Sequence, residues 1–175
     1  MTADADHVYA ALAQLTTGIY VLTARDAATR HGMSSSWVTQ VSGTPPLLMA
    51  AVDVGHATHA LVAASGDFAL NVVGARGTAL EEYFYSAASR RPDNLAGIAC
   101  DTSPLGLPYL RDAMVCLECR VVAQHRAGDH SLFIAEITDV VLRRDDRALT
   151  SLDLDYVYVG TVLARRARGD RTSSS

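Results

Sequence analysis

Short apolar runs, one of which alternates with polar positions, recur between turn-forming residues along the chain, which predicts a protein built mainly from strands. The runs are rich in aliphatic, β-branched and aromatic residues. One further segment is polar and Ser-rich, yet its residue types still suit a strand. The predicted strands are Gly18–Thr23, the polar segment His31–Ser42, Leu47–Val52, Phe68–Val73, Met114–Gln124, Leu132–Leu142 and Leu154–Val162.

Helical spacing of apolar residues is confined to short segments. Residues 4–15 predict an amphipathic helix with Asp4 or Asp6 as its cap, Thr58–Ala64 a second, and Thr78–Tyr85 a third with Thr78 as cap. Crossover helices long enough for a parallel sheet are missing, so six or seven strands with short helices favour an antiparallel barrel. Residues 86–112 carry three prolines and predict a long irregular loop that serves function or covers a partner surface.

A chain of 175 residues with 49% hydrophobic and 19% charged residues is sized for one folded domain. We place that domain at residues 1–164 and an Arg- and Ser-rich flexible tail at residues 165–175. The length excludes a two-domain dehydrogenase.

The charged residues narrow the choice of partners. All fifteen basic residues are arginine, and nineteen acids give a net charge of −4, which argues against nucleic acid as a partner. No apolar run is long enough for a membrane span, the N-terminus does not resemble a signal peptide, and three cysteines do not predict a disulfide framework. We therefore expect a cytoplasmic protein.

Two pairs of side chains have the spacing of metal ligands. Cys116 and Cys119 fall within a predicted strand, where positions three apart face opposite sides, so buried small residues are the favoured interpretation. His56 and His59 begin a predicted helix beside Thr58, and no third ligand is evident. Contact with an anion at the helix start is preferred there over a metal.

A row of hydroxyl and amide groups follows Gly32 and flanks Trp37. Such a row fits either a polar edge strand or a surface that hydrogen-bonds a flat polar ligand. His130 follows Gly128 and Asp129 between two strong strands, where it is either part of a simple turn or a proton donor for a substrate. The glycine patterns of a P-loop, a dinucleotide-binding turn and a hydrolase nucleophile elbow are absent.

The order of these segments resembles the flavin reductase-like family. The resemblance rests on GMSSSWVTQVS (32–42), PPLL (45–48), THALV followed by SGDFALNV (58–72), LECRV (117–121) and GDHSLFIAEI (128–137), and it covers residues 10–163. It implies a six-stranded antiparallel split β-barrel with short helices, a homodimer, and FMN or FAD bound near the dimer interface. It also implies hydride transfer from NADH or NADPH to the flavin, often on behalf of a partner monooxygenase.

The resemblance and the residue pattern together predict the site. His130 is expected to position the substrates or deliver a proton. Gly55-His56-Ala57 replaces the family's usual Ser-Ser-Arg, so arginine, histidine or backbone N–H groups must meet the flavin phosphate. The predicted cofactor-binding residues are Ser34, Ser35, Ser36, Trp37, Thr39, Gln40, Ser42, His56, Thr58, His59, Asn71, Arg90 and Arg91.

Two other functions fit the same fold. One is a flavin-bound electron-transfer or oxidase protein with a different electron donor. The other is a non-catalytic split-barrel binding protein. A yellow preparation that NADH or NADPH promptly bleaches separates the reductase from both.

Overall fold

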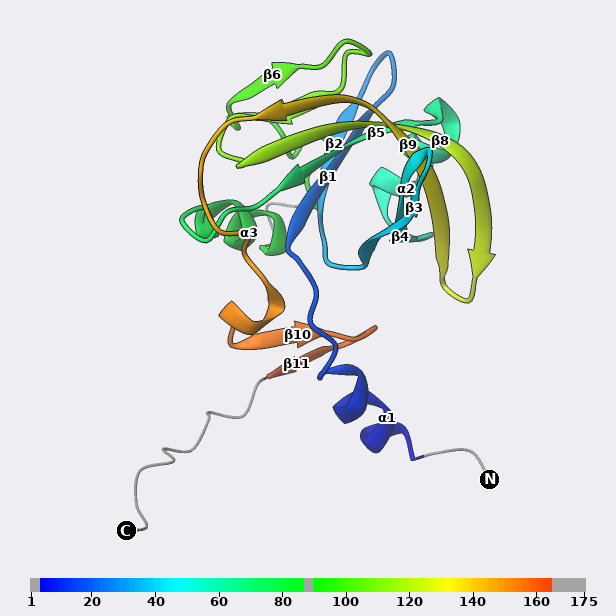
Figure 1. Cartoon of the computed structure of the whole chain (residues 1–175), viewed down its shortest axis with the longest axis vertical. Helices are drawn as coiled ribbons and strands as arrows, with labels where there is room; N and C mark the ends of the chain where they lie inside the picture. The colour runs from blue at the N-terminus through cyan, green and yellow to red at the C-terminus, as the bar shows by residue number, and fades with distance from the viewer. Residues whose placement is uncertain (1–3, 87–89, 165–175) are drawn as a thin grey trace.

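The computed structural model describes residues 4–86 and 90–164, and its centre is one antiparallel sheet of seven strands. The sheet curls round itself, with long, strongly bent β8 and β9 on one side (Figure 1). Its strands, in spatial order, are β2 (Arg30–Ser35), β1 (Tyr20–Arg25), β5 (Asp67–Val72), β8 (Val115–Ala127), β9 (His130–Leu142), β4 (Pro46–Asp53) and β3 (Val38–Gly43). The predicted class, mainly β and antiparallel, is confirmed.

The sheet has seven strands, within the six or seven that the sequence pattern favours and one more than the six that the resemblance implies. The polar segment 31–42 is not one strand. It breaks at Ser36 and Trp37 into β2 and β3, which occupy opposite edges of the sheet. The segment Leu154–Val162, predicted as the last strand, also differs. It contributes to a separate hairpin of β10 (Tyr156–Tyr158) and β11 (Val162–Ala164). That hairpin lies below the barrel (Figure 1).

Three short α-helices accompany the strands: α1 (Ala5–Leu12), α2 (Ala57–Ser65) and α3 (Thr78–Tyr85). The Asp4 side chain caps α1 as predicted, by accepting from the Asp6 amide at 3.2 Å. The predicted cap of α3 is wrong, because Gly77 is its N-cap and Thr78 is its first residue. A short 3₁₀ turn, η2 (Ser151–Asp153), precedes β10. In the described part of the chain, no helix is long and apolar enough to cross a membrane.

The long segment after α3 is more regular than predicted. It contains β6 (Cys100–Thr102) and β7 (Pro108–Leu110), which pair antiparallel. Tyr109 and Leu110 are buried there because β7 lies over β1 and β5. The segment therefore covers one face of the chain's own main sheet, a role that was not among those predicted for it. The predicted tail, residues 165–175, lies outside the described residues.

Hydrophobic residues form two clusters, one on each face of the sheet, and this explains why the central strands have unbroken apolar runs. In β5, Phe68 and Leu70 enter one cluster while Ala69 enters the other, as alternation along a strand requires. Cys116 and Cys119 on β8 also divide between the clusters, which confirms that they face opposite sides. Burial of each Phe or Leu side chain stabilises the fold by about 1.5–3 kcal/mol. The two clusters therefore hold the central strands in place from both faces of the sheet.

Candidate functional site

A cavity of about 190 Å³ opens where β2 ends and the chain breaks toward β3. Elements far apart in the sequence supply its walls, including the start of β9, the end of α3 and the C-terminal hairpin. The lining residues are Met33, Ser34, Ser35, Ser36, Trp37, Ala51, His56, Phe84, Tyr85, His130 and Tyr158. We call this hollow the aromatic cavity.

The loop after α3 fixes the strand that carries the serines. The buried Asn94 side chain accepts from the Gly32 amide at 2.8 Å and donates to the Gly32 carbonyl at 2.6 Å. Gly32 is also needed for close packing, since a Cβ there would lie 2.7 Å from a ring carbon of Phe84. Strand β2 is thereby held against α3, and the Ser34–Ser36 backbone is positioned at the mouth of the cavity.

Trp37 lies between two aromatic partners. Its ring centroid is 4.7 Å from that of His130 and 5.3 Å from that of Tyr158. Both pairs are tilted, within the range in which aromatic rings attract each other. The three rings give the cavity an aromatic lining, which is typical of sites that bind planar ligands.

His130 is almost completely buried, at 6% exposure, and one of its ring nitrogens is engaged. Nδ1 lies 2.7 Å from Oδ1 of Asp129, and this hydrogen bond holds the pKa of the Asp129 carboxyl below its usual value. With Nδ1–H donated to the carboxylate, Nε2 is the nitrogen available for a ligand proton. His130 begins β9 rather than belonging to the turn, which is formed by Gly128 at a positive φ of 61° and by Asp129.

The Ser35 hydroxyl is a buried polar group on this wall whose hydrogen-bonding capacity is not used. Ser35 is 6% exposed, and its Oγ has no hydrogen-bond partner among the described residues. A buried polar atom left without a partner is costly, so such atoms normally meet a protein group, water or ligand. Ser35 lines the cavity, which places this unmet hydroxyl beside the space a ligand would fill.

Helix α2 begins beside the cavity in a small cluster of polar side chains. Nδ1 of His56 accepts from the Thr58 amide at 3.2 Å and so caps the helix. Burial, reinforced by the neighbouring His31, holds the pKa of His56 below its ordinary value. Thr58 is fully buried, and its hydroxyl lies 2.9 Å from Nδ1 of His31. His56 therefore faces the cavity as a neutral side chain, whereas Thr58 is engaged behind it.

The structure brings together six of the fourteen predicted site residues on the cavity wall. These six are Ser34, Ser35, Ser36, Trp37, His56 and His130.

The other eight lie elsewhere. Asn71 is fully buried, where it donates to the Val21 carbonyl at 3.0 Å and accepts from the Leu110 amide at 2.8 Å. His59 lies 2.8 Å from the Ser131 hydroxyl. The remaining predicted residues have these positions: Thr58 lies behind His56, Thr39 and Gln40 border a separate apolar groove, Ser42 lies further along β3, and Arg90 and Arg91 are exposed before Asn94.

Tyr158, Tyr85 and Phe84 were not predicted as site residues, although all three line the cavity. The alternating Tyr156-Val157-Tyr158 pattern was visible in the sequence, but it indicated only a strand. A buried carboxyl also lies next door: Glu81 is 4% exposed and accepts a short hydrogen bond from the Tyr156 hydroxyl. Tyr156 in turn stacks on Tyr85, with ring centroids 4.6 Å apart.

Comparisons with known proteins define the class to which this fold and cavity belong. Residues 12–161 match the family described as "Flavin reductase like domain". The NADH:riboflavin 5'-phosphate oxidoreductase of Streptomyces pristinaespiralis is 37% identical over 142 residues, which is 79% of this chain and 77% of that protein. The chain therefore belongs to the flavin reductase-like family.

Two more distant proteins show the range of the similarity. The reductase component of a 4-nitrophenol 4-monooxygenase/4-nitrocatechol 2-monooxygenase from Rhodococcus opacus is 29% identical over 123 residues, 70% of this chain and 64% of that protein. The solved structure of flavin reductase PheA2 in its native state superposes with a TM-score of 0.74 at 24% identity, covering 94% of this chain and all of that one. This superposition supports the split-barrel fold.

Proposed function

We propose that this protein is an NAD(P)H-dependent flavin reductase that transfers hydride from a reduced nicotinamide to FMN or FAD. The aromatic cavity with its unpartnered Ser35 hydroxyl carries the proposal, because it combines aromatic side chains with polar groups, as a site for one planar polar ring requires. Membership of the flavin reductase-like family supports this assignment. The relative from Streptomyces pristinaespiralis has a name that specifies NADH and riboflavin 5'-phosphate.

The residues present fit an isoalloxazine ring. Ser34, Ser35 and Ser36 would hydrogen-bond its polar edge, and Trp37 with Tyr158 would border its ring system. When bound, a flavin supplies the hydride-accepting chemistry, so the protein needs neither a nucleophile nor a metal for that step. The polypeptide has to bind the ring, orient it and leave one side open for the nicotinamide.

His130 is the proposed proton-handling residue. Its Nδ1–H bond to Asp129 fixes the tautomer, so that Nε2 can accept a proton or, when the ring is protonated, donate one. Its contact with Trp37 fixes the plane of the imidazole. The assigned role is positioning and proton delivery beside the reacting rings, and no covalent step at His130 is required.

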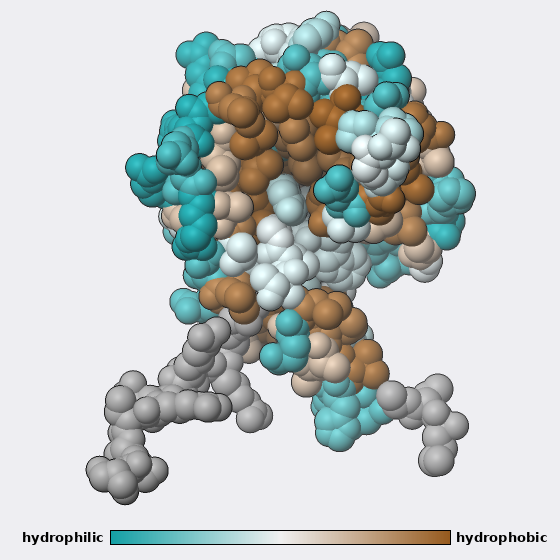
Figure 2. Space-filling view, viewed as in Figure 1, coloured by the Kyte–Doolittle hydropathy of each residue, from teal (hydrophilic) through white to brown (hydrophobic). Residues whose placement is uncertain are grey.

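A homodimer is part of the proposal. An apolar groove of about 300 Å³ lies between β3, β4 and β5, and its more exposed lining residues include Val38, Pro46 and Leu47. Helix α1 buries none of its residues, and Leu12 on it is 40% exposed. Figure 2 shows apolar side chains gathered around a hollow in the barrel and again near α1. Exposed apolar surface of this kind is typical of an interface, and a second copy of this chain is the proposed occupant.

A partner monooxygenase is the proposed consumer of the reduced flavin, as the name of the Rhodococcus opacus relative states for that protein. The electron-transfer alternative predicts instead a bound flavin that neither nicotinamide reduces.

The test uses the purified full chain. FMN, FAD and riboflavin are titrated separately while the quenching of flavin fluorescence is followed, and anaerobic NADH or NADPH is then added while bleaching is recorded. A wild-type protein that binds flavin and bleaches it with either nicotinamide supports the proposal. Ser35→Ala should weaken flavin binding, whereas Ser65→Ala, on the far end of α2, serves as the matched control. Bound flavin that neither nucleotide reduces would refute the reductase assignment.

A further inference from the structure

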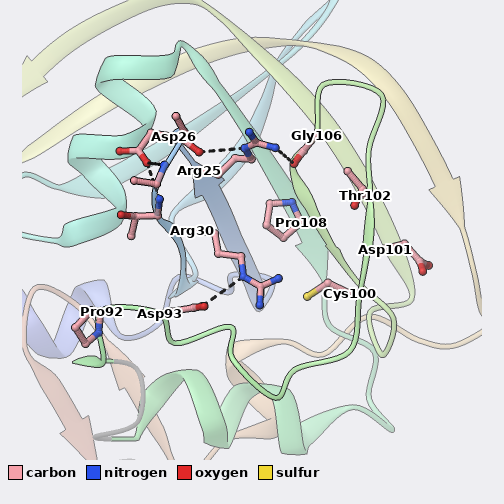
Figure 3. A pocket seen from close by; sticks show the side chains of 13 residues that line it. Arg25, Asp26, Arg30, Pro92, Asp93, Cys100, Asp101, Thr102, Gly106 and Pro108 are labelled. Atoms are coloured by element: carbon pink, nitrogen blue, oxygen red, sulfur yellow. Dashed lines mark hydrogen bonds and ion pairs between the residues drawn. The ribbon is translucent and has the colours of Figure 1, made fainter.

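A second hollow, of about 550 Å³, lies on the barrel between the β1–β2 hairpin and the β6–β7 pair. Arg25 and Arg30 reach into it from the two strands of the hairpin, with Cys100 and Pro108 on the facing wall (Figure 3). It shares no lining residue with the aromatic cavity. Its size falls within the range usual for small-molecule sites.

Both guanidinium groups are only partly used. Arg25 donates from Nε to the Asp26 carbonyl at 3.3 Å and from a terminal nitrogen to the Gly106 carbonyl at 3.2 Å. Each guanidinium carries five N–H donors, so three on Arg25 have no partner among the described residues. Arg30 is similar: Nε lies 3.4 Å from Asp93, and a terminal nitrogen donates to the Leu95 carbonyl at a long 3.4 Å.

The carboxylates in the same hollow are already engaged. Oδ1 of Asp26 accepts from the Ala28 and Thr29 amides at 2.8 and 2.7 Å, which shapes the hairpin turn. Asp101 is held by Arg111 and Arg143, each at 2.8 Å. Asp93, the third carboxylate on the wall, lies beside Arg30 and accepts from the Leu95 amide at 3.1 Å. Each carboxylate therefore has donors within the protein, while the unused N–H groups of Arg25 and Arg30 are the donors that the hollow offers to a ligand.

The positions of the two arginines carry an energetic cost. Arg25 and Arg30 are directly opposed in the β1–β2 register, and both line the same hollow. Like charges on directly opposed residues of an antiparallel pair destabilise it. Arg25 has no carboxylate within ion-pair distance in the described part of the chain, although, together with hydrogen bonds from the Ala28 and Thr29 amides, its charge helps to lower the pKa of the neighbouring Asp26 carboxyl. Asp26 and Asp93, which lies beside Arg30, therefore relieve part of the repulsion.

From this juxtaposition we infer a second ligand site that binds a phosphorylated small molecule of nucleotide size. A phosphate dianion would neutralise the opposed guanidinium groups and accept several of their spare N–H bonds, the geometry for which arginine is well suited. The shared chemistry is the phosphate monoester. The site does not depend on the flavin reductase assignment, because its walls are separate from the aromatic cavity.

The test titrates the full-length protein with three probes by isothermal calorimetry at low salt: adenosine 5'-monophosphate, inorganic phosphate and uncharged adenosine. The Arg25→Gln/Arg30→Gln double variant removes both donors. Arg120→Gln is the matched control, since Arg120 is an exposed arginine paired with Asp67 away from the hollow. If circular dichroism shows that the double variant is unfolded, the two single variants decide the question.

A local readout comes from Cys100, which lines the hollow and is half-buried, whereas the other two cysteines are buried. Burial raises the pKa of its thiol, so labelling by a thiol reagent is followed at alkaline pH. Bound nucleotide should slow labelling of Cys100 in the wild type and in Arg120→Gln, and should leave the rate unchanged in the double variant.

We expect adenosine 5'-monophosphate to bind and adenosine not to bind. The affinity for the monophosphate should be at least about tenfold lower in the double variant. If inorganic phosphate binds and the nucleotide does not, the inference that the ligand is of nucleotide size would be wrong. Equal binding by adenosine, equal binding by the double variant, or no binding of any probe would overturn the phosphate site. Displacement of the nucleotide by riboflavin would place it in the aromatic cavity and also overturn the proposal.

Discussion

Replacing His130 with alanine separates its proposed chemical role from its packing role. The packing loss that bears on the cavity wall is the ring contact with Trp37, at 4.7 Å between centroids. An aromatic pair of this kind is worth about 0.5–1.5 kcal/mol, so loosening Trp37 should weaken flavin binding by no more than about tenfold. Loss of a positioned proton donor typically costs about 10²–10⁴-fold in rate. We therefore expect His130→Ala to lower the rate of flavin reduction by at least about 100-fold.

The assay is anaerobic stopped-flow reduction of protein-bound flavin by NADH or NADPH, with the flavin dissociation constant measured separately by fluorescence. Asp129→Asn is the companion variant. Because the Asp129 side chain is 81% exposed, water screens its bond to His130, and the rate should change by only a few fold. A wild-type rate in His130→Ala, or equal losses in rate and affinity, would refute the proton-handling role.

Three further predictions concern stability and assembly. Asn71→Ala should lower the free energy of unfolding by about 3 kcal/mol in urea titrations, because it leaves the buried Leu110 amide without its hydrogen-bond acceptor. The flavin affinity of the folded protein should stay unchanged, and a stable variant that cannot bind flavin would contradict this. Burial and Glu82 raise the pKa of Glu81 above its ordinary 4.5, so wild-type stability should fall as pH rises from 4.5 through the raised value. Glu81→Gln should flatten that dependence in pH-resolved unfolding, and an unchanged slope would count against it. Leu12→Asp should shift sedimentation from dimer to monomer if α1 contacts a second copy; sedimentation identical to wild type would exclude α1 from the interface.

The strands were predictable wherever packing on both faces left a continuous apolar run. Leu70 in β5 and Leu22 in β1 lie within predicted strands and inside the barrel. Strand periodicity cannot say which sheet a strand joins, and so the Tyr156–Tyr158 segment was predicted without its separate hairpin. The break at Ser36 and Trp37 was missed for a related reason: every residue around it tolerates extended backbone, and only the closure of the sheet decides where the chain turns.

Site residues were predictable where a polar side chain faces the cavity and not where it serves the core. Asn71 and Ser35 look alike in sequence, as polar residues in or beside strands, yet Asn71 is saturated by backbone groups while the Ser35 hydroxyl is left without a partner among the described residues. Thr58 is a similar case, because His31 engages its hydroxyl and removes it from the surface. Which polar groups are already satisfied depends on distant segments, and that information exists only in the folded chain.

The same reasoning explains why the aromatic cavity forms where regular structure fails. At Ser36 and Trp37 the chain passes from β2, at one edge of the sheet, to β3, at the other edge, and these two residues belong to neither strand. The Trp37 carbonyl still accepts from the Ala51 amide at 2.9 Å, while the Trp37 ring contacts His130 and Tyr158. The end of β2 and the two residues after it therefore line the same hollow. The local conflict between strand pattern and observed structure therefore coincides with the proposed binding site, as expected where function competes with regular folding.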